Sequence, residues 1–483
     1  MARDNKPMKS LKELEFLRSA LQSDSEIFSN EQFLEWIKQK NQDVTVNITE
    51  VPFKELRKWQ VEAHTGNLVH ETGKFFSIEG IQVETDFGNV KSWTQPIINQ
   101  PEIGFLGIIV KKINGVLHFL MQAKIEPGNI NVVQLSPTLQ ATKSNYSQVH
   151  KGKKPLYLEY FNGEKEVEVI VDQLQSEQGA RFLKKRNRNI IVEISEDIQL
   201  YDNFCWVTLG QIKEFIKCDN IVNMDTRTVI SCIQYGSYTS NTVNFHSALL
   251  GEQAINKKER ALLHSILTND VALNSIDSII SWLTGLKSHY ELNVKQIPLN
   301  TVDNWVNDGT SIYHAQNKYF KVIGVNVEIS NREVASWDQP IIKPAQEGVI
   351  AFVTKEINGV YHFLVQAKLE AGNFDIIELA PTVQCLTGNY RKGLNSYEVP
   401  FIDTVLQAHP EQVWYSSFQS EEGGRFYHEQ NRNMIVEVGP EFPLEVPKNY
   451  MWMTLNQLYD FIRFNNYLNI SARSLLSAIR YKL

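Results

Sequence analysis

The feature that most constrains the fold of this chain is an internal duplication. Residues Ile113–Tyr146 align without a gap to Ile357–Tyr390, at an offset of 244 positions, and 19 of the 34 aligned residues are identical. The same offset aligns SWTQPII (92–98) with SWDQPII (336–342) and SEQGARF (176–182) with SEEGGRF (420–426). Two inserted residues then shift the register, so that WVTLGQIKEF (206–215) matches WMTLNQLYDF (452–461). Solenoid repeats have periods of about 20–50 residues, so this long period predicts a duplicated domain.

The length of the chain, 483 residues, also exceeds what one hydrophobic core usually supports. We expect an N-terminal helical extension over residues 1–32, a first repeat over 33–235, a linker over 236–277 and a second repeat over 278–483. The linker begins with a polar stretch and continues into Glu259–Leu267, whose apolar spacing predicts one helix. Each repeat should open with a short amphipathic helix, which the spacing of these residues indicates: Phe33, Trp36 and Ile37 in one copy, Ile279, Trp282 and Leu283 in the other.

Most of each repeat has the pattern of β-strands. Branched and aromatic residues are concentrated in Gly104–Lys111, Val116–Ala123, Asn131–Leu135 and Ile190–Ile194. The Asn114-Gly115 pair predicts a tight hairpin between the first two of these segments. Two helices are expected beside the sheet, over Val169–Phe182 and over Thr208–Ile216, with Thr208 as the N-cap of the second. The predicted class is therefore α+β, with one mixed sheet and packed helices in each of two copies.

Charge, hydropathy and cysteine usage narrow the class of protein. The formal net charge of −7 disfavours a general nucleic-acid-coating role, although it leaves room for a local cationic pocket. The N-terminus is polar, and no stretch approaches the roughly 18 apolar residues of a membrane helix. The four cysteines have no metal-ligand spacing and are expected to be buried, reduced thiols. These features predict a cytoplasmic protein.

Polar residues that are identical in both copies are the best candidates for function, because apolar core positions tolerate exchange more readily. His70 and His314 occupy equivalent places next to a strand, where a histidine could transfer a proton or simply hydrogen-bond a loop. His118 and His362 lie between apolar residues in a strand, and we expect these two to be satisfied core histidines.

The sequence Gln-Ala-Lys ends a strand in each copy, at Lys124 and Lys368, and a Gly-Asn pair follows at Asn129 and Asn373. A lysine beside turn amides suits an anionic ligand. The alternative is a surface ion pair with the nearby Glu126 or Glu370, which would contribute little. Gln122 and Gln366 belong to the same motif and are candidate substrate ligands.

Arginines also repeat between the copies. Arg181 and Arg425 are expected late in a helix, and Arg188 and Arg432 follow seven residues later; guanidinium groups favour bidentate contacts to phosphate. The first copy adds Lys184, Lys185 and Arg186, whereas the second has Tyr427, His428 and Glu429 at the aligned positions. A solvated, charged face is the alternative reading of this run.

Aromatic residues complete the candidate set. Trp93 and Trp337 could stack on a nucleobase or pack against the neighbouring proline. Tyr146 and Tyr390 follow an asparagine after a strand, where a phenol could donate a proton. His150 belongs to a segment that has no clear match in the second copy, so the copies have diverged. Phosphate-binding loops, dinucleotide fingerprints, nucleophile elbows and zinc spacings do not occur in the sequence, which predicts no cofactor and no metal.

The segments SWTQPII, FLMQAKIEPGNINVVQLSPTLQATKSNY, QSEQGARF and RNRNIIVEI, with their second-copy partners, resemble the NDP-hexose 2,3-dehydratase family of deoxysugar biosynthesis. The resemblance implies an NDP-4-keto-6-deoxyglucose substrate, usually the dTDP form, and a homodimer with a nucleotide-sugar pocket in each half. It also implies a Nudix-like fold in each half, although the Nudix metal signature does not occur in this sequence.

The implied reaction requires a base for the C3 proton, an acid for the C2 hydroxyl and a group that stabilises an enolate, but no redox cofactor. The catalytic candidates are His70 or His314 as base, Tyr146 or Tyr390 as acid, and Lys124 or Lys368 beside the enolate or phosphate. The candidate substrate-binding residues are Trp93, Gln122, Asn129, His150, Arg181, Arg188, Trp337, Gln366, Asn373, Glu421, Arg425, Tyr427 and Arg432.

Three other functions remain open at the level of sequence. A Nudix-type hydrolase would need a cluster of metal-binding glutamates, whose signature neither copy has. A ketoisomerase could act on the same substrate. A binding or sensing protein would use both pockets without chemistry, against which the paired histidines and tyrosines count.

Overall fold

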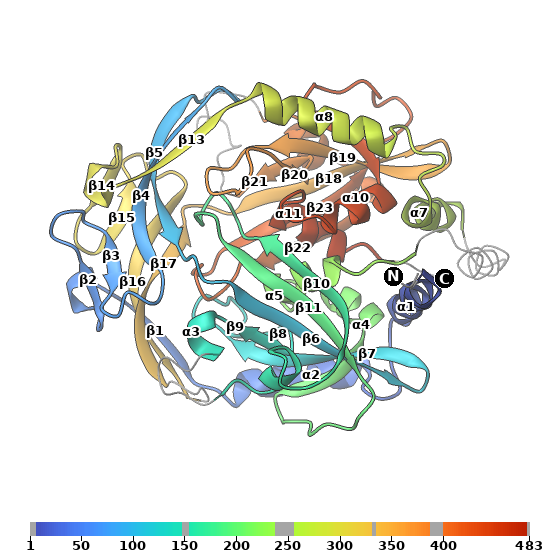
Figure 1. The fold of residues 1–483 in the computed structure, drawn as a ribbon, viewed down its shortest axis with the longest axis horizontal. Coiled ribbons are helices and arrows are strands. Elements are labelled where there is room, and N and C mark those ends of the chain that lie inside the picture. The colour runs from blue at the N-terminus through green and yellow to red at the C-terminus, as the bar shows by residue number, and fades with distance from the viewer. Residues whose placement is uncertain (1–5, 147–153, 237–255, 331–334, 387–398, 481–483) are drawn as a thin grey trace, which may run out of the picture.

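The computed structural model describes residues 6–146, 154–236, 256–330, 335–386 and 399–480. These residues form two repeats that pack closely around a shared centre (Figure 1). Among the described helices, none combines the length and the apolar character that a membrane crossing requires.

Each repeat contains a mixed seven-stranded sheet. The first has the order β10-β11-β6-β7-β12, with β8 beside β7 and β9 beside β6. The second has the order β20-β19-β18-β23-β22, with β24 beside β19 and β21 beside β18. The pairs β6–β11 and β18–β23 are parallel, and the others are antiparallel. The strands of the first sheet are β6 (Gly104–Ile113), β7 (Val116–Ile125), β8 (Val133–Ser136), β9 (Leu139–Ala141), β10 (Glu168–Ser176), β11 (Arg186–Ile194) and β12 (Phe204–Thr208). Those of the second are β18 (Gly348–Ile357), β19 (Val360–Lys368), β20 (Glu378–Pro381), β21 (Val383–Cys385), β22 (Val413–Ser420), β23 (Gln430–Glu437) and β24 (Tyr450–Thr454).

The hairpin between β6 and β7 confirms the prediction made from Asn114-Gly115. Both residues have positive φ, 51° and 80°, which is the conformation that a two-residue turn with the twist of its strands requires. The second copy repeats the turn at Asn358 and Gly359, with φ of 55° and 77°. The mixed character of this sheet is likewise confirmed, and each predicted strand segment contains a strand, although β8 begins at Val133 and not at Asn131.

The helix predicted over Val169–Phe182 is wrong. Residues Glu168–Ser176 form strand β10, which pairs with β11, and residues 177–184 form a turn. Val169, Ile170 and Val171 are β-branched residues that pack well on a pleated sheet, and pairing with a neighbouring strand overrides the helix-like spacing that follows them. Arg181 and Arg425 therefore lie in turns and not in helices.

A second, smaller sheet in each repeat was not predicted. These two sheets have five strands each and are antiparallel. Their strands are β1 (Val46–Val51), β2 (Trp59–Val61), β3 (Leu68–His70), β4 (Ser77–Thr85), β5 (Ser92–Asn99), β13 (Leu292–Ile297), β14 (Trp305–Asn307), β15 (Ser311–His314), β16 (Phe320–Ile329) and β17 (Ser336–Pro344). The sequence indicated one sheet per copy, because the short strands β2, β3, β14 and β15 carry little of the alternating pattern.

The two repeats exchange strands in these small sheets. Strand β1 of the first repeat pairs with β16 of the second, with Val46 opposite Ile329. Strand β13 of the second repeat pairs with β4 of the first, with Leu292 opposite Thr85. Both exchanged sheets lie at the left end of the molecule in Figure 1, side by side. Neither small sheet is therefore complete within one repeat.

Helices surround and join the sheets. They are α1 (Lys6–Leu21), α2 (Asn30–Gln42), α3 (Lys143–Tyr146), α4 (Leu209–Phe215), α5 (Met224–Ser231), α7 (Lys257–Leu267), α8 (Ile276–His289), α9 (Ile402–Leu406), α10 (Leu455–Ile462) and α11 (Ile470–Ser477). The predicted amphipathic helices are confirmed as α2 and α8, each capped by a serine, and the predicted helix after Thr208 is confirmed as α4 with a capping box. Their apolar residues are buried at Phe33 and Ile37, and at Ile279 and Leu283.

The N-terminal helix α1 and the linker helix α7 occupy equivalent places. Ser19 of α1 donates its hydroxyl to Leu117 O and accepts from Leu209 N at 2.9 Å. Ser265 of α7 donates to Tyr361 O and accepts from Leu455 N at 2.9 Å. Each helix thus satisfies an amide at the start of α4 or α10. The linker helix predicted at Glu259–Leu267 is present as part of α7.

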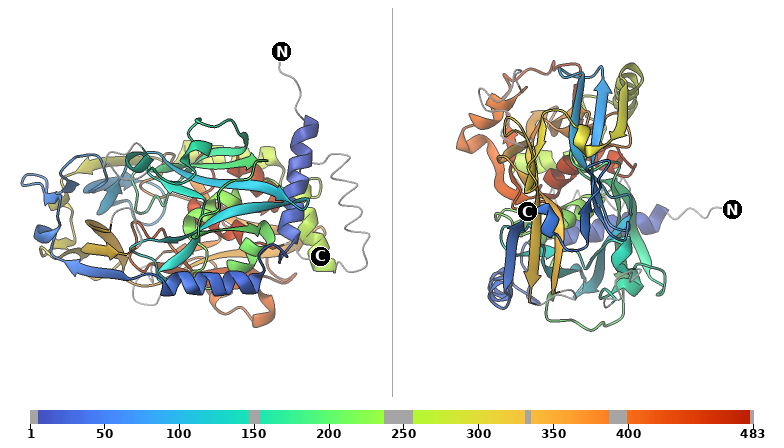
Figure 2. Two further views of the ribbon diagram at one scale, coloured as in Figure 1. Left: turned by 90° about the horizontal axis from the view of Figure 1, so that it is seen from below. Right: turned by 90° about the vertical axis from the view of Figure 1, so that its left-hand side faces the viewer.

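Helices α5 and α11 lie in the middle of the molecule, between the two seven-stranded sheets (Figure 1; two further views in Figure 2). Arg227 of α5 donates to Ser474 Oγ and Ser420 O of the second repeat. Arg473 of α11 donates to Thr228 Oγ1 and Ser176 O of the first. The reciprocal pattern identifies a local two-fold relation between the repeats at this point.

Candidate active site

The Gly-Asn turn of each repeat docks against the glycine turn of the other. Gly128 N donates to Gly423 O at 2.7 Å, and Gly372 N donates to Gly179 O at 2.7 Å. A methyl group added to Gly128 would lie 1.6 Å from Phe426 O, so only glycine fits there. The residues beside these turns therefore come from both repeats.

Two clusters of charged and polar side chains form at these contacts. The first cluster comprises Lys124, Glu126, Glu177, Lys185, Asp225, Glu422 and Arg425. The second cluster comprises the aligned residues Lys368, Glu370, Glu421, Glu429, Ser471, Gln178 and Arg181. Each cluster combines side chains of both repeats, whereas the sequence predicted one pocket inside each half.

Gln140 organises the first cluster. It donates from Nε2 to Glu126 Oε1 at 2.8 Å, and its backbone oxygen accepts from Lys124 Nζ at 3.1 Å. Asn223, the N-cap of α5, donates to Gln140 Oε1 at 3.2 Å. Glu126 is only 7% exposed, and its Oε2 has no hydrogen-bond partner among the described residues. The alternative of a surface Lys–Glu pair does not apply to so buried a carboxylate.

Two further carboxylates face the same space without hydrogen bonds. Within the described part of the chain, neither Asp225 nor Glu422 accepts a hydrogen bond through its side chain. Burial and then the charge of Glu422 raise the pKa of Asp225, which is 3% exposed, well above its usual range. Burial and then Glu126 raise the pKa of Glu422 to about 8. The cluster therefore holds carboxyl groups that keep their protons near neutral pH.

Cations balance these carboxylates. Arg425 donates from Nε to Gln100 Oε1 at 3.1 Å, and its guanidinium lies 4.0 Å from the centre of the Phe76 ring. Lys185 is buried and donates to Glu102 O. Burial lowers the pKa of Lys185, while Glu177 raises it. The basic run of the first copy is therefore not simply a solvated face, because Lys185 points into the protein.

The second cluster has the same glutamine contacts as the first cluster but differs from it at three charged positions. Gln384 donates to Glu370 Oε1 at 2.9 Å and Asn469 donates to Gln384 Oε1 at 2.6 Å, as in the first cluster. Gln178 replaces Glu422, Ser471 replaces Asp225 and Glu429 replaces Lys185. Burial raises the pKa of Glu429 to about 8, and neither of its carboxylate oxygens has a partner among the described residues.

Glu421 is the acidic residue of the second cluster that was among the candidate substrate-binding residues. Its Oε2 accepts from Gln178 Nε2 at 3.0 Å and its Oε1 accepts from Asn431 Nδ2 at 2.7 Å. Burial raises its pKa to about 7, which Arg227 partly opposes. Its counterpart Glu177 in the first cluster accepts from Asn187 Nδ2 at 2.6 Å.

The two candidate histidine bases lie in the five-stranded sheets and not beside the candidate lysines. His70 ends β3, where its ring packs on Phe75 and Trp59 and its Nδ1 lies 2.9 Å from Thr72 Oγ1. His314 ends β15 against Trp305 and Tyr319. Figure 1 shows β3 and β15 at the left end, away from β8 and β20, which pair with the strands that carry Lys124 and Lys368.

The other two histidines behave as expected. His118 and His362 are buried in β7 and β19, at 1% and 0% exposure. His118 Nε2 lies 3.1 Å from Ser25 Oγ, and His362 Nε2 accepts from Leu273 N at 2.9 Å. Both are therefore satisfied core histidines.

Tyr146 and Arg188 lie together at the edge of the first cluster. The Tyr146 ring packs on Phe105, and burial followed by the charge of Glu102 raises its pKa. Arg188 makes a bidentate pair with Asp172, at 2.7 Å for both contacts. Arg432, its counterpart, is exposed and donates to Ser416 Oγ at 3.1 Å. Tyr390 and His150 lie outside the described residues.

The remaining candidates support turns and strands around the clusters. Trp93 and Trp337 each donate to a glutamine, Gln95 or Gln339, at 2.9 Å, and these glutamines in turn donate to Ala180 O and Gly424 O. Asn129 donates to Val132 O at 3.0 Å, while both side-chain atoms of Asn373 lack a partner among the described residues. Gln122 lies half-buried in β7, Gln366 donates to Pro381 O, and Tyr427 stacks on His428.

Sequence reasoning missed Asp225 and Glu422 and undervalued Glu126. Identity between the copies does not point to Asp225 and Glu422, whose counterparts are Ser471 and Gln178; Glu126 is identical in both copies, but its sequence context also fits a surface ion pair with Lys124. A difference between the copies would have pointed to Asp225 and Glu422: several charged residues of the first cluster have aligned partners that are neutral or oppositely charged.

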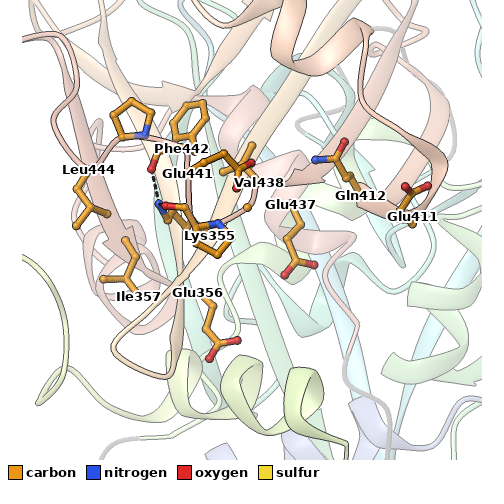
Figure 3. A pocket seen from close by; sticks show the side chains of 13 residues that line it. Lys355, Glu356, Ile357, Glu411, Gln412, Glu437, Val438, Glu441, Phe442 and Leu444 are labelled. Carbon is orange, nitrogen blue, oxygen red and sulfur yellow. Dashed lines mark hydrogen bonds between the residues drawn. The ribbon is translucent and has the colours of Figure 1, made fainter.

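Two surface cavities lie away from both clusters. One of about 700 Å³ lies at the ends of β18 and β23 and is lined by Glu356, Glu411, Glu437 and Glu441, with Lys355 donating to Pro440 O (Figure 3). It contains no predicted site residue, and its acidic lining disfavours a diphosphate. No group of three or more His, Cys, Asp or Glu side chains in the described ranges could hold a metal ion. The cysteines there are free thiols; Cys205 and Cys232 are buried as expected, Cys385 is partly buried, and Cys218 is exposed, contrary to expectation.

Comparison with known proteins identifies relatives over almost the whole chain. The family model described as NDP-hexose 2,3-dehydratase matches residues 30–233 and again 276–479. A dTDP-4-dehydro-6-deoxy-α-D-glucopyranose 2,3-dehydratase of Saccharopolyspora spinosa is 46% identical over 475 residues, which are 98% of this chain and 96% of that protein. Proteins of the same name from Streptomyces violaceoruber and Amycolatopsis orientalis are 42% and 41% identical, covering 93% and 95% of this chain and 96% and 92% of theirs.

Proposed function

The chain belongs to the NDP-hexose 2,3-dehydratase family, and on that premise we propose that it removes water across C2 and C3 of dTDP-4-keto-6-deoxy-D-glucose. The observation that carries the proposal is the collinear match of both repeats to relatives named for this reaction. The product is the 2,6-dideoxy-3,4-diketo sugar nucleotide.

The reaction makes definite demands on the protein. The C4 ketone acidifies C3–H, so a base can remove that proton and leave an enolate. The enolate then re-forms the ketone as the C2–O bond breaks, and an acid protonates the departing hydroxyl to give water. The remaining enol, with a C2=C3 double bond, becomes the C3 ketone when C2 takes up a proton. A base, an acid and an enolate stabiliser suffice.

The first cluster offers groups of each kind. Lys124 is suited to the enolate oxygen or a phosphate, and Arg425 and Arg188 to the diphosphate. Tyr146 at its edge is the phenolic candidate for the acid. The candidates for the base are His70, His314 and the carboxylates of the first cluster. The position of the carboxylates supports a carboxylate as the base.

Several features of organisation belong to the same proposal. We infer a Nudix-like fold for each seven-stranded mixed sheet with its packed helix. Because α1 and α7 are equivalent, we assign both helices to their repeats and regard the remaining segment, 237–255, as the linker proper. Assembly as a homodimer and a cytoplasmic location complete the proposal; light scattering of the purified protein tests the former.

The test of the function is direct. Purified protein is incubated with dTDP-4-keto-6-deoxyglucose in D2O without added metal, and C2 and C3 are followed by NMR. Loss of the C2 oxygen, with conversion of C2 to a CH2-type carbon, is expected. Deuterium exchange at C3 alone, isomerisation of the ketone, or an unchanged substrate would contradict the proposal.

A further inference from the structure

We propose that Glu126 and Glu422, contributed by different repeats, form the acid–base pair of the reaction. Glu126 takes the proton from C3, and Glu422 protonates the hydroxyl that leaves C2. The inference rests on the proposed function and deepens it, because it assigns the chemistry to the first cluster and to carboxylates instead of histidines.

The geometry of Gly424 brings the two carboxylates together. A side chain begun at Gly424 would lie 2.6 Å from Glu422 Oε1 and 3.4 Å from Glu126 Oε1. Both oxygens therefore border the space that this glycine leaves open. The residue aligned with Gly424 in the turn of the first repeat is Ala180, so a methyl group is present at that position in the second cluster.

The contacts of both carboxylates leave them available for a ligand. Glu126 is more than nine-tenths buried, is held through Oε1 by Gln140, and has no partner at Oε2 among the described residues. Glu422 accepts no hydrogen bond from that part of the chain. Glu126 is a buried carboxylate with an unpartnered oxygen, which is costly unless a ligand or proton satisfies it, and Glu422 is partly buried beside it.

The second cluster provides an internal comparison. It keeps the glutamate, lysine, glutamine and arginine that correspond to Glu126, Lys124, Gln140 and Arg425. It lacks Glu422 and Asp225, whose places are taken by Gln178 and Ser471. Neither an amide nor a hydroxyl replaces a carboxylic acid as proton donor near neutral pH. The framework is shared, but only the first cluster has a carboxyl group at the position of Glu422; the buried Glu429 of the second cluster stands at the position of Lys185.

The charges around Glu422 suit an acid. Burial, Glu126 and Glu177 raise its pKa while Arg425 and Lys185 lower it, and the net result is a pKa of about 8. Asp225 of α5 also faces it and has a raised pKa of its own. At neutral pH Glu422 therefore carries the proton that the leaving hydroxyl needs, and it becomes a carboxylate when water departs.

Isosteric amide variants separate the two roles. In Glu126→Gln the base is absent, so both C3–H exchange in D2O and loss of the C2 oxygen should fall about 10²-fold or more. In Glu422→Gln the base remains, so C3–H exchange should persist while loss of the C2 oxygen falls about 10²-fold or more. Gln178 shows that the equivalent turn accommodates a glutamine.

Glu370→Gln is the matched control, because Glu370 accepts the same glutamine contact in the second cluster. It should keep native turnover, and thermal melting of all three variants reports whether each remains folded. Equal losses in Glu126→Gln and Glu370→Gln, or full elimination by folded Glu422→Gln, would overturn the assignment. Loss of C3–H exchange in Glu422→Gln would overturn the division of roles. Inactivity of the native protein would instead overturn the proposed function.

Discussion

Arg181 and Arg425 occupy aligned positions in the two repeats but differ in their surroundings. Arg425 is half-buried and donates to Gln100, whereas the position that corresponds to Gln100 in the second repeat is Pro344, which has no acceptor in its side chain. Arg181 is 5% exposed, stacks on Phe320, and has no hydrogen-bond partner at Nε or one terminal nitrogen among the described residues. Burial lowers the pKa of both.

These differences predict unequal roles for the two arginines. Replacing Arg425 with lysine should lower kcat/KM about 10-fold or more, because a lysine cannot keep both the Gln100 contact and a bidentate contact to a ligand. Replacing Arg181 with lysine should lower kcat/KM by a smaller factor and act mainly on stability. Steady-state kinetics beside thermal melting checks this; equal losses of kcat/KM would contradict a single catalytic cluster.

The protonation of Glu422 predicts a pH dependence. An acid must be protonated to act, and the pKa of Glu422 is raised to about 8, so turnover should decline as the pH rises through about 8. Glu422→Asp should keep an alkaline limb with a shifted midpoint, and Glu422→Gln should lose it along with most activity. A kcat/KM profile from pH 6 to 9.5 makes the measurement. A flat alkaline limb in the native protein would argue for a different acid.

At the scale of elements, the contact between turns of opposite repeats depends on glycine. The Gly128 amide bonds to Gly423 O, and Gly128 O accepts from His428 N at 2.9 Å. His428 has a positive φ of 50° and Lys184 in the equivalent turn one of 49°, a conformation that is uncommon for residues other than glycine.

Gly128→Ala should therefore destabilise the protein strongly, by about 3 kcal/mol or more, because the new methyl group would overlap Phe426 O. Gly285→Ala is the control: Gly285 lies in α8, has open space around it, and should be neutral or stabilising by up to about 1 kcal/mol. Chemical denaturation of both variants tests the difference, and equal stabilities would show that the turns do not hold the repeats together.

The sequence predicted those elements well whose formation depends on residues that are neighbours in the chain. The Asn-Gly hairpins, the capped helix after Thr208 and the buried His118 all follow from neighbouring residues. The strand β10 was mistaken for a helix because its identity depends on β11, which lies beside it only in the folded chain. For the same reason Lys124 was recognised as a candidate, while Glu422, which reaches Glu126 from the other repeat, was not.

At the scale of the whole molecule, the duplication was predicted but the relation between the copies was not. A repeat in the sequence says that two similar units exist, and nothing in it says which unit supplies the edge strand of each sheet. The pairings β1–β16 and β13–β4, together with the reciprocal bonds of Arg227 and Arg473, show that neither unit is self-contained.

A single repeat should therefore not exist as a folded monomer. Residues 1–255 alone would leave β4 without β13 and β1 without β16, exposing long strand edges. We expect this fragment to dimerise or aggregate, and to form a 1:1 complex when co-expressed with residues 256–483. Size-exclusion chromatography with light scattering and circular dichroism checks both. A stable, structured monomer of the fragment would contradict the strand exchange.

The strand exchange has a consequence for how such a protein can change over time. Since β1 and β13 are equivalent, a protein of one repeat could make the same exchange with a second molecule of itself, and every substitution would then appear twice. Joining the two copies in one gene releases that restraint. Each position can mutate in one copy alone, so one of two formerly matching clusters can acquire a carboxylate while the other receives an amide, and the frame that both depend on stays intact.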